Sequence, residues 1–284
     1  MTGQSVLVLG MHRAGTSMLS RVLSLLLHYE GSSHAGRGNP AGHWEDLSMR
    51  TSLNGLLRSV GGSWWLPPPV DTDWSNSAIP SLAKVRAQKA LAQRREPIWV
   101  WKDPRISITL GFWLSQPRFS EATIVVGLRS PSSVARSLER RNRMPQSVGL
   151  KLWDHYYRSI CMQSAGREVL WWCAEDLVQS TEESISGLAR QLSLRGLSVD
   201  SPDRAVQTIR TELMSASSKT SEEEPLYRTL SDLAGTWSQA PRLEVTPETE
   251  WHRPDNLDRR EIALLVPDAA LRNLRTRRIA KLTR

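Results

Sequence analysis

The chain has 284 residues, a formal net charge of +8 and two cysteines. Two cysteines are too few for a disulfide framework or a zinc site of the usual spacing, and they are typical of a reducing compartment, so we expect a cytoplasmic protein. The sequence has no apolar run as long as a membrane span and no leader-like stretch before residue 5, so we expect neither a span nor a signal peptide.

Much of the positive charge lies at the end of the sequence, in residues 270–284. This segment contains no acid, and its basic residues are Arg272, Arg275, Arg277, Arg278, Lys281 and Arg284. A solvated amphipathic helix is the simplest interpretation of such a tail. We therefore expect no nucleic-acid partner, although a nucleic-acid-binding tail remains an alternative.

The first predicted elements are a strand, a phosphate-binding loop and a helix. The apolar run 5–9 ends at Gly10, a four-residue turn follows, and Gly15 leads into a segment with helical spacing of apolar residues. Two glycines let the backbone curl so that its N–H groups point inward, and the helix N-terminus adds partial positive charge. The pattern predicts a site for phosphate or sulfate, with an ordinary strand-to-helix turn as the alternative.

The composition of this loop disfavours a magnesium–triphosphate ligand. Nucleotide kinases carry a lysine before the loop's final hydroxyl residue, where it reaches the phosphates. Thr16 stands at that position here, and the nearby cation is Arg13, inside the turn.

Further along, a glycine- and proline-rich loop over residues 31–42 is expected to cross the mouth of the phosphate site. It leads into His43, Trp44 and Glu45, and then into a helical pattern between residues 47 and 57. A second loop follows around residues 67–69, and a polar helix is expected over 82–95.

Three apolar runs, at 98–101, 122–128 and 169–172, are typical of buried strands, and each is followed by charged residues. Strands that alternate with helices predict a three-layer α/β/α fold with a central parallel sheet, whose ligands bind at the carboxyl ends of the strands. We expect a single domain over 1–284, with a core at 1–200 and a helical or irregular extension at 201–284.

Taken together, three motifs resemble the PAPS-dependent sulfotransferase family, in its phosphate-loop, carbohydrate-type branch. They are G-M-H-R-A-G-T-S at 10–17, L-R-S-P-S-S-V-A-R-S at 128–137 and A-E-D-L at 174–177, and the resemblance covers about residues 5–60 and 95–180. It implies that the protein binds 3′-phosphoadenosine 5′-phosphosulfate (PAPS) without a metal and releases adenosine 3′,5′-bisphosphate (PAP). The implied 5′ site is Arg13, Ala14, Gly15, Thr16 and Ser17, and the implied 3′-phosphate site is Arg129 and Ser137.

The resemblance also suggests catalytic residues. Arg13 stands where many cytosolic members have lysine, and its expected role is electrostatic. Glu45 is the expected base for the acceptor hydroxyl, with His43 as the second candidate. The alternatives are structural roles, in which Glu45 caps a helix and His43 lines the loop. Lys102 is expected to neutralise the transferring sulfuryl group.

Asp103, the neighbour of Lys102, allows two interpretations. It is expected to form a structural ion pair with Arg105. An aspartate at the end of a buried strand is also typical of a magnesium ligand, which would indicate a kinase using Mg–ATP.

The sequence has twelve tryptophans and two phenylalanines. Trp171 and Trp172 fall on a predicted buried strand and are expected in the core. Trp44, Trp64 and Trp65 fall in loops, where indoles often stack on sugars or rings. We expect these three tryptophans to lie at the acceptor site. We also expect the acceptor to be a carbohydrate, a glycolipid or a secondary metabolite.

Overall fold

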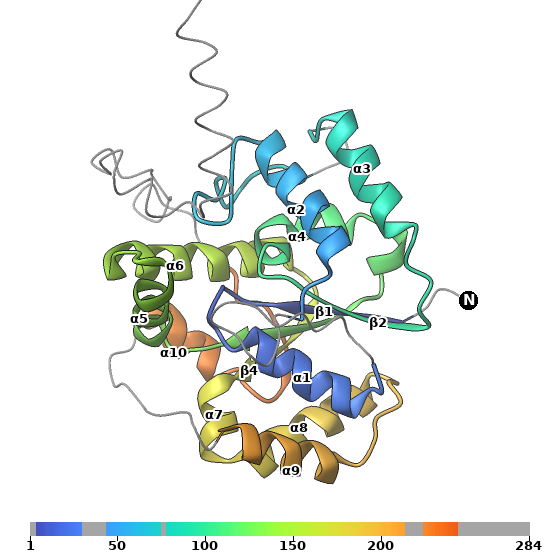
Figure 1. Cartoon of the computed structure of the whole chain (residues 1–284), viewed down its shortest axis with the longest axis vertical. Coiled ribbons are helices and arrows are strands. Elements are labelled where there is room, and N and C mark those ends of the chain that lie inside the picture. The colour runs from blue at the N-terminus through green and yellow to red at the C-terminus, as the bar shows by residue number, and fades with distance from the viewer. Residues whose placement is uncertain (1–3, 30–43, 75–77, 214–223, 244–284) are drawn as a thin grey trace, which may run out of the picture.

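The computed structural model describes residues 4–29, 44–74, 78–213 and 224–243. Its centre is a five-stranded sheet in the order β2-β1-β3-β4-β5, flanked by helices on both faces (Figure 1). The strands are β1 (Gln4–Leu9), β2 (Ile98–Lys102), β3 (Thr123–Leu128), β4 (Glu168–Cys173) and β5 (Trp237–Gln239). The α/β class and the three-layer arrangement predicted from the sequence are confirmed.

The helices follow the predicted alternation over most of the chain. Their bounds are α1 (Thr16–Leu26), α2 (Leu47–Ser59), α3 (Ser81–Leu91), α4 (Ile106–Leu114), the 3₁₀ helix η1 (Pro117–Phe119), α5 (Pro131–Asn142), α6 (Gln146–Gln163), α7 (Ala174–Gln179), α8 (Thr181–Leu194), α9 (Pro202–Leu213) and α10 (Pro225–Ser231).

The two faces of the sheet form two separate hydrophobic cores, because successive side chains of a strand point to opposite sides. Leu7 and Leu9 of β1 join the core under α2, α4, α5 and α6, whereas Val6 and Val8 join the core under α1, α8 and α9. Figure 1 shows these two helical layers above and below the strands. Burial on both faces explains why the strands are continuous apolar runs. Trp171 and Trp172 are both buried, as predicted.

The sheet departs from the predicted parallel arrangement at one edge. β1 to β4 are parallel, but β5 pairs antiparallel with β4, from Trp237 opposite Leu170 to Gln239 opposite Glu168. The sheet is therefore mixed, because a short return strand closes one edge.

The chain beyond residue 200 contributes buried side chains to both hydrophobic cores. Ile209 of α9 is fully buried in one core, and Leu230 of α10 is fully buried in the other. The basic tail 270–284 and His43 lie outside the described residues. Within the described part of the chain, none of the helices has the length and apolar character needed to cross a membrane.

The strand order places a topological switch point at the carboxyl ends of β1 and β3. From β1 the chain passes to β2 on one side, and then to β3 on the other side of β1. Connections that leave two neighbouring parallel strands in opposite directions open a space between them, and ligands of α/β proteins bind there. The predicted phosphate loop follows β1 and Arg129 follows β3, so both lie next to this switch point.

Candidate anion-binding and transfer site

The predicted phosphate loop, residues 10–16, begins at a glycine that no other residue can replace without strain. Gly10 has φ of 134°, and a Cβ at this position would lie 2.5 Å from the carbonyl oxygen of Gly127 in β3. The Ser107 hydroxyl of α4 accepts a hydrogen bond from the Gly10 amide (2.9 Å) and donates one to its carbonyl (3.1 Å). The end of β1 is therefore held between β3 and α4.

The middle of the loop turns through left-handed backbone at Arg13 (φ 72°) and Gly15 (φ 82°). For a residue with a side chain, such as Arg13, this conformation costs about 1–2 kcal/mol. Gly15 is the N-cap of α1 and, having no side chain, makes no capping hydrogen bond itself. The first N–H groups of α1 face this turn, which is the geometry that the predicted anion site requires.

The two predicted anion sites lie against each other, although they are far apart in the sequence. The Arg13 Nε donates a hydrogen bond to the Ser137 Oγ of α5 at 2.8 Å. The Arg129 Nη1 donates to the Arg13 carbonyl oxygen at 3.3 Å. Trp153 of α6 donates from Nε1 to the Arg129 carbonyl at 2.9 Å and so fixes the backbone there. The structure therefore brings Arg13, Ser137 and Arg129 together at the ends of β1 and β3.

These arginines repel one another, which an anion would relieve. Burial lowers the pKa of Arg13, and the nearby Arg141, Arg129 and Arg140 lower it further. Burial also lowers the pKa of Arg129, against a raising effect of Glu175. A guanidinium stays charged through such shifts, so a bound anion would be stabilised by this cluster.

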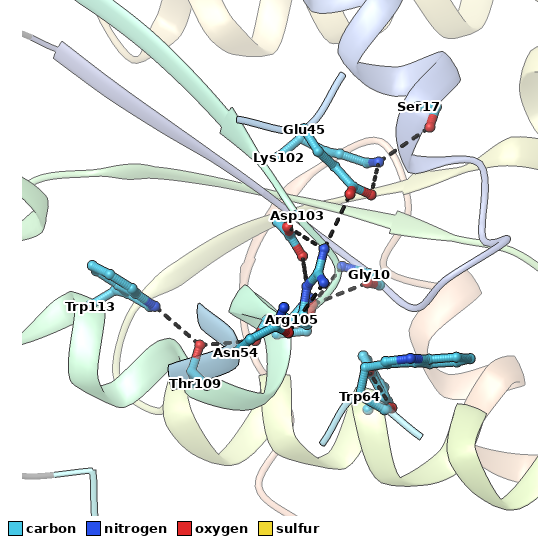
Figure 2. Close-up of polar contacts among 12 residues, drawn as sticks. Gly10, Ser17, Glu45, Asn54, Trp64, Lys102, Asp103, Arg105, Thr109 and Trp113 are labelled. Carbon is cyan, nitrogen blue, oxygen red and sulfur yellow. Dashed lines mark hydrogen bonds and ion pairs between the residues drawn. The ribbon is translucent and has the colours of Figure 1, made fainter. Parts of the chain in front are cut away.

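A second group of charges surrounds Lys102 at the end of β2 (Figure 2). Lys102 is 3% exposed, and its Nζ donates to the Ser17 Oγ and to the Glu45 Oε1, both at 3.2 Å. Burial lowers the pKa of Lys102, while Glu45 and Asp103 act in the opposite direction. The ammonium group therefore connects the first turn of α1 with the expected base.

Arg105 anchors the other side of Glu45. Its Nη2 lies 3.2 Å from the Glu45 Oε2, and its Nε and Nη2 bind the two carboxylate oxygens of Asp103 at 2.7 and 2.8 Å. The Arg105–Asp103 ion pair predicted from the sequence is confirmed. Because Asp103 is fully buried and both its oxygens bind Arg105, its geometry does not suit the alternative role of a magnesium ligand.

Glu45 does not cap a helix, so that alternative interpretation was wrong. The N-cap of α2 is the next residue, Asp46, whose Oδ1 accepts hydrogen bonds from the amides of Ser48 (2.9 Å) and Met49 (3.2 Å). The Glu45 side chain instead points to Lys102 and Arg105, and it is 12% exposed.

The three loop tryptophans lie in different environments. The ring of Trp44 lies 5.7 Å from the guanidinium carbon of Arg21. Trp64 and Trp65 are partly buried against the core that contains Leu7 and Leu9. None of these contacts identifies an acceptor, so the role of the three tryptophans remains a prediction.

The sequence interpretation missed His12, which lies in the phosphate loop beside Arg13. Its ring is 4.6 Å from the Trp64 ring, and its Nε2 is buried without a hydrogen-bond partner among the described residues. Burial, with Arg105 and Lys102, holds the pKa of His12 well below 6.5, so this imidazole is neutral. The signal available in the sequence was a histidine next to the arginine of an anion loop.

Comparisons with known proteins found similarity among solved structures. No family model matches the sequence, and no curated protein matches it. Among solved structures, the chain is similar to one described as "Sulfotransferase Domain from the Curacin Biosynthetic Pathway", with 17% sequence identity and a TM-score of 0.42. The similarity covers 82% of this chain and 97% of the other.

Proposed function

We propose that this protein is a sulfotransferase that moves the sulfuryl group of PAPS to a hydroxyl of a carbohydrate, a glycolipid or a secondary metabolite. The observation that carries the proposal is the contact between Arg13 and Ser137, with Arg129 beside them. It joins a phosphate loop without lysine to a second cationic site in mid-chain. A nucleotide with two separate anionic ends needs such a pair of sites, whereas a simple triphosphate does not.

The residues present suit this donor chemically. Arg129 and Ser137 would hold the 3′-phosphate, since a guanidinium fork and a hydroxyl are both good phosphate partners. Residues 13–17 would hold the phosphosulfate through backbone N–H groups and the hydroxyls of Thr16 and Ser17. The donor supplies an activated sulfuryl group, and the protein contributes positioning and charge.

In the proposed reaction, Glu45 accepts the proton of the acceptor hydroxyl while the acceptor oxygen bonds to sulfur. The bond between sulfur and the 5′-phosphate oxygen breaks, that oxygen keeps the electron pair, and PAP is released. Lys102 and Arg13 stabilise the negative charge on the sulfuryl and phosphate oxygens, by analogy with phosphoryl transfer. Trp44, Trp64 and Trp65 would contact the acceptor.

The first test is ligand-induced stabilisation. PAP without magnesium is expected to raise the melting temperature in a concentration-dependent manner, because a ligand that binds only the folded state stabilises it. Stabilisation by Mg–ATP and not by PAP would contradict the proposal and favour a kinase. A transfer assay with labelled PAPS and a panel of glycan and metabolite acceptors then tests the activity.

The second test is the Arg129→Ala variant. It is expected to weaken PAP binding by about tenfold to a hundredfold, the usual value of a hydrogen bond to a charged group, without lowering the wild-type melting temperature by more than a few degrees. Calorimetric titration with PAP measures the change. Arg167→Ala is the control, because Arg167 donates to the Ser120 carbonyl next to the amino ends of β3 and β4. Equal affinities of the two variants for PAP would show that Arg129 does not bind the 3′-phosphate.

A further inference from the structure

The two carboxylate oxygens of Glu45 have different partners. Oε1 lies 3.2 Å from the Lys102 Nζ, and Oε2 lies 3.2 Å from the Arg105 Nη2. Figure 2 shows the resulting chain of contacts from Ser17 through Lys102 and Glu45 to Arg105 and Asp103. Glu45 is therefore shared between two cations, one on each oxygen.

These two cations differ in how firmly they are held. Arg105 makes two side-chain bonds to Asp103, its own backbone amide donates to the same carboxylate at 2.9 Å, and its Nη1 donates to the Asn54 Oδ1 at 3.3 Å. The guanidinium is planar and is fixed by this fork-like pairing. Arg105 consequently offers Glu45 a rigid partner.

Lys102 offers a partner that can change. Its ammonium is a compact charge on a four-carbon chain, and it divides its bonds between Glu45 and Ser17. Ser17 belongs to the first turn of α1, beside the amides where the anion is proposed to bind. A small rotation of the lysine chain therefore suffices to exchange a carboxylate oxygen for a ligand oxygen.

We propose that Arg105, locked by Asp103, is a positioning residue that keeps Glu45 in place through Oε2 while Lys102 exchanges Oε1 for the oxygens of the sulfuryl group. This inference rests on the proposed function. Donor binding then frees Oε1 to accept the acceptor proton, so the base becomes available only when the donor is present. Glu45 thus has a second role, as a stand-in anion that neutralises Lys102 before the donor arrives.

The exchange can be measured without turnover. PAPS and PAP differ by the sulfuryl group, so the ratio of their affinities, determined without acceptor, isolates the contribution of that group. Lys102→Ala is expected to reduce this ratio by about tenfold, because a charged partner of the sulfuryl group is lost. Glu45→Gln is expected to raise it by about threefold or more, because a neutral amide competes less well for Lys102.

The positioning role is tested with Arg105→Lys. This variant keeps a positive charge but loses the fork, so kcat is expected to fall by about tenfold to a hundredfold through misplacement of Glu45. The PAPS/PAP affinity ratio and the KM for PAPS are expected to change less than kcat does, because Lys102 is intact and Glu45 keeps its charge. A merely structural role of Arg105 would not separate kcat from donor binding in this way.

Two further variants complete the experiment. Asn54→Ala is used if Arg105→Lys does not fold. It removes one hydrogen bond of Arg105 without leaving a buried charge, and it is expected to lower kcat by a smaller factor than Arg105→Lys would. Arg195→Lys changes an arginine paired with Glu168 at the start of β4, and it is the matched control with unchanged kinetics.

The outcomes separate the inference from the proposed function. If wild type binds neither PAPS nor PAP, the proposed function fails. If it binds both and transfers sulfate, but Glu45→Gln leaves the affinity ratio unchanged or Arg105→Lys behaves like Arg195→Lys, the inference is wrong and the function stands.

Discussion

Gly10 is pressed against β3 where the phosphate loop begins. Besides the Gly127 oxygen at 2.5 Å, a Cβ here would meet the Thr16 methyl group at 2.8 Å. The residue also has φ of 134°, which L side chains rarely adopt. An added Cβ would therefore suffer both from these close contacts and from the unfavourable φ, and a shift that relieves the contacts would not remove the backbone strain.

We expect Gly10→Ala to reduce the free energy of unfolding by about 2–4 kcal/mol, from backbone strain and overpacking together. Urea unfolding measures the change. Gly187→Ala in α8 is the control, because a Cβ there meets nothing within 4 Å and alanine is the better helix former. It is expected to be neutral or to stabilise by up to about 1 kcal/mol. A loss of the same size at both positions would contradict this explanation.

At the residue scale, the sequence predicted which charged groups end each strand and the pairing of Asp103 with Arg105, but not the partners of Glu45. Parallel strands place their carboxyl ends together, so the proximity of Arg13 to Arg129 follows from the predicted topology. The pairing of Glu45 with both Lys102 and Arg105 depends on the path of the loop before α2. No periodicity in the sequence encodes that path.

At the scale of elements, α6 has a buried titratable group outside the candidate site. His155 is 1% exposed, and burial lowers its pKa from 6.5 to about 4. The folded protein therefore keeps this imidazole neutral under conditions in which the unfolded chain protonates it. The contribution of neutral His155 to the free energy of unfolding is fully present above pH 6.5 and decreases as the pH falls toward 4.

We expect His155→Gln to flatten the pH dependence of unfolding between pH 6.5 and 4. The difference between variant and wild type over this interval should reach about 2–3 kcal/mol, since each pKa unit corresponds to about 1.4 kcal/mol. Chemical denaturation at several pH values gives the two curves. Parallel curves would show that His155 does not contribute to acid sensitivity.

The same scale shows where prediction from periodicity stops. β1 to β4 and the helices α1 and α2 were predicted within a few residues because each has a clear apolar pattern, and α3 was predicted as a polar helix. α4 was missed because its buried residues go all round the helix and give no stripe. β5 has three residues, too few for an alternation, and its position depends on β4.

At the scale of the whole molecule, the boundary near residue 200 predicted for the core is open to test. α9 and α10 bury apolar side chains in opposite cores, and β5 adds a strand to the sheet. These contacts indicate that the first 200 residues depend on later ones.

We expect Leu230→Ala to destabilise the protein by about 2–4 kcal/mol, because the side chain is fully buried in α10. Leu194→Ala is the control, since Leu194 is 73% exposed and should change stability by less than about 0.5 kcal/mol. Denaturant unfolding compares them. A chain that ends at residue 200 is expected to lose cooperative unfolding, and a cooperative transition in that chain would support the original boundary.

The two cores differ in side-chain volume as well as in position. On one face of the sheet β2 contributes Trp99 and Trp101, whereas on the other it contributes Val100. Polarity cannot specify strand alignment here, because both faces are apolar. A shift of β2 by one residue would force indole rings into space that fits a valine. The bulk of these tryptophans therefore selects the alignment of the edge strand, and with it the position of Lys102 beside Ser17.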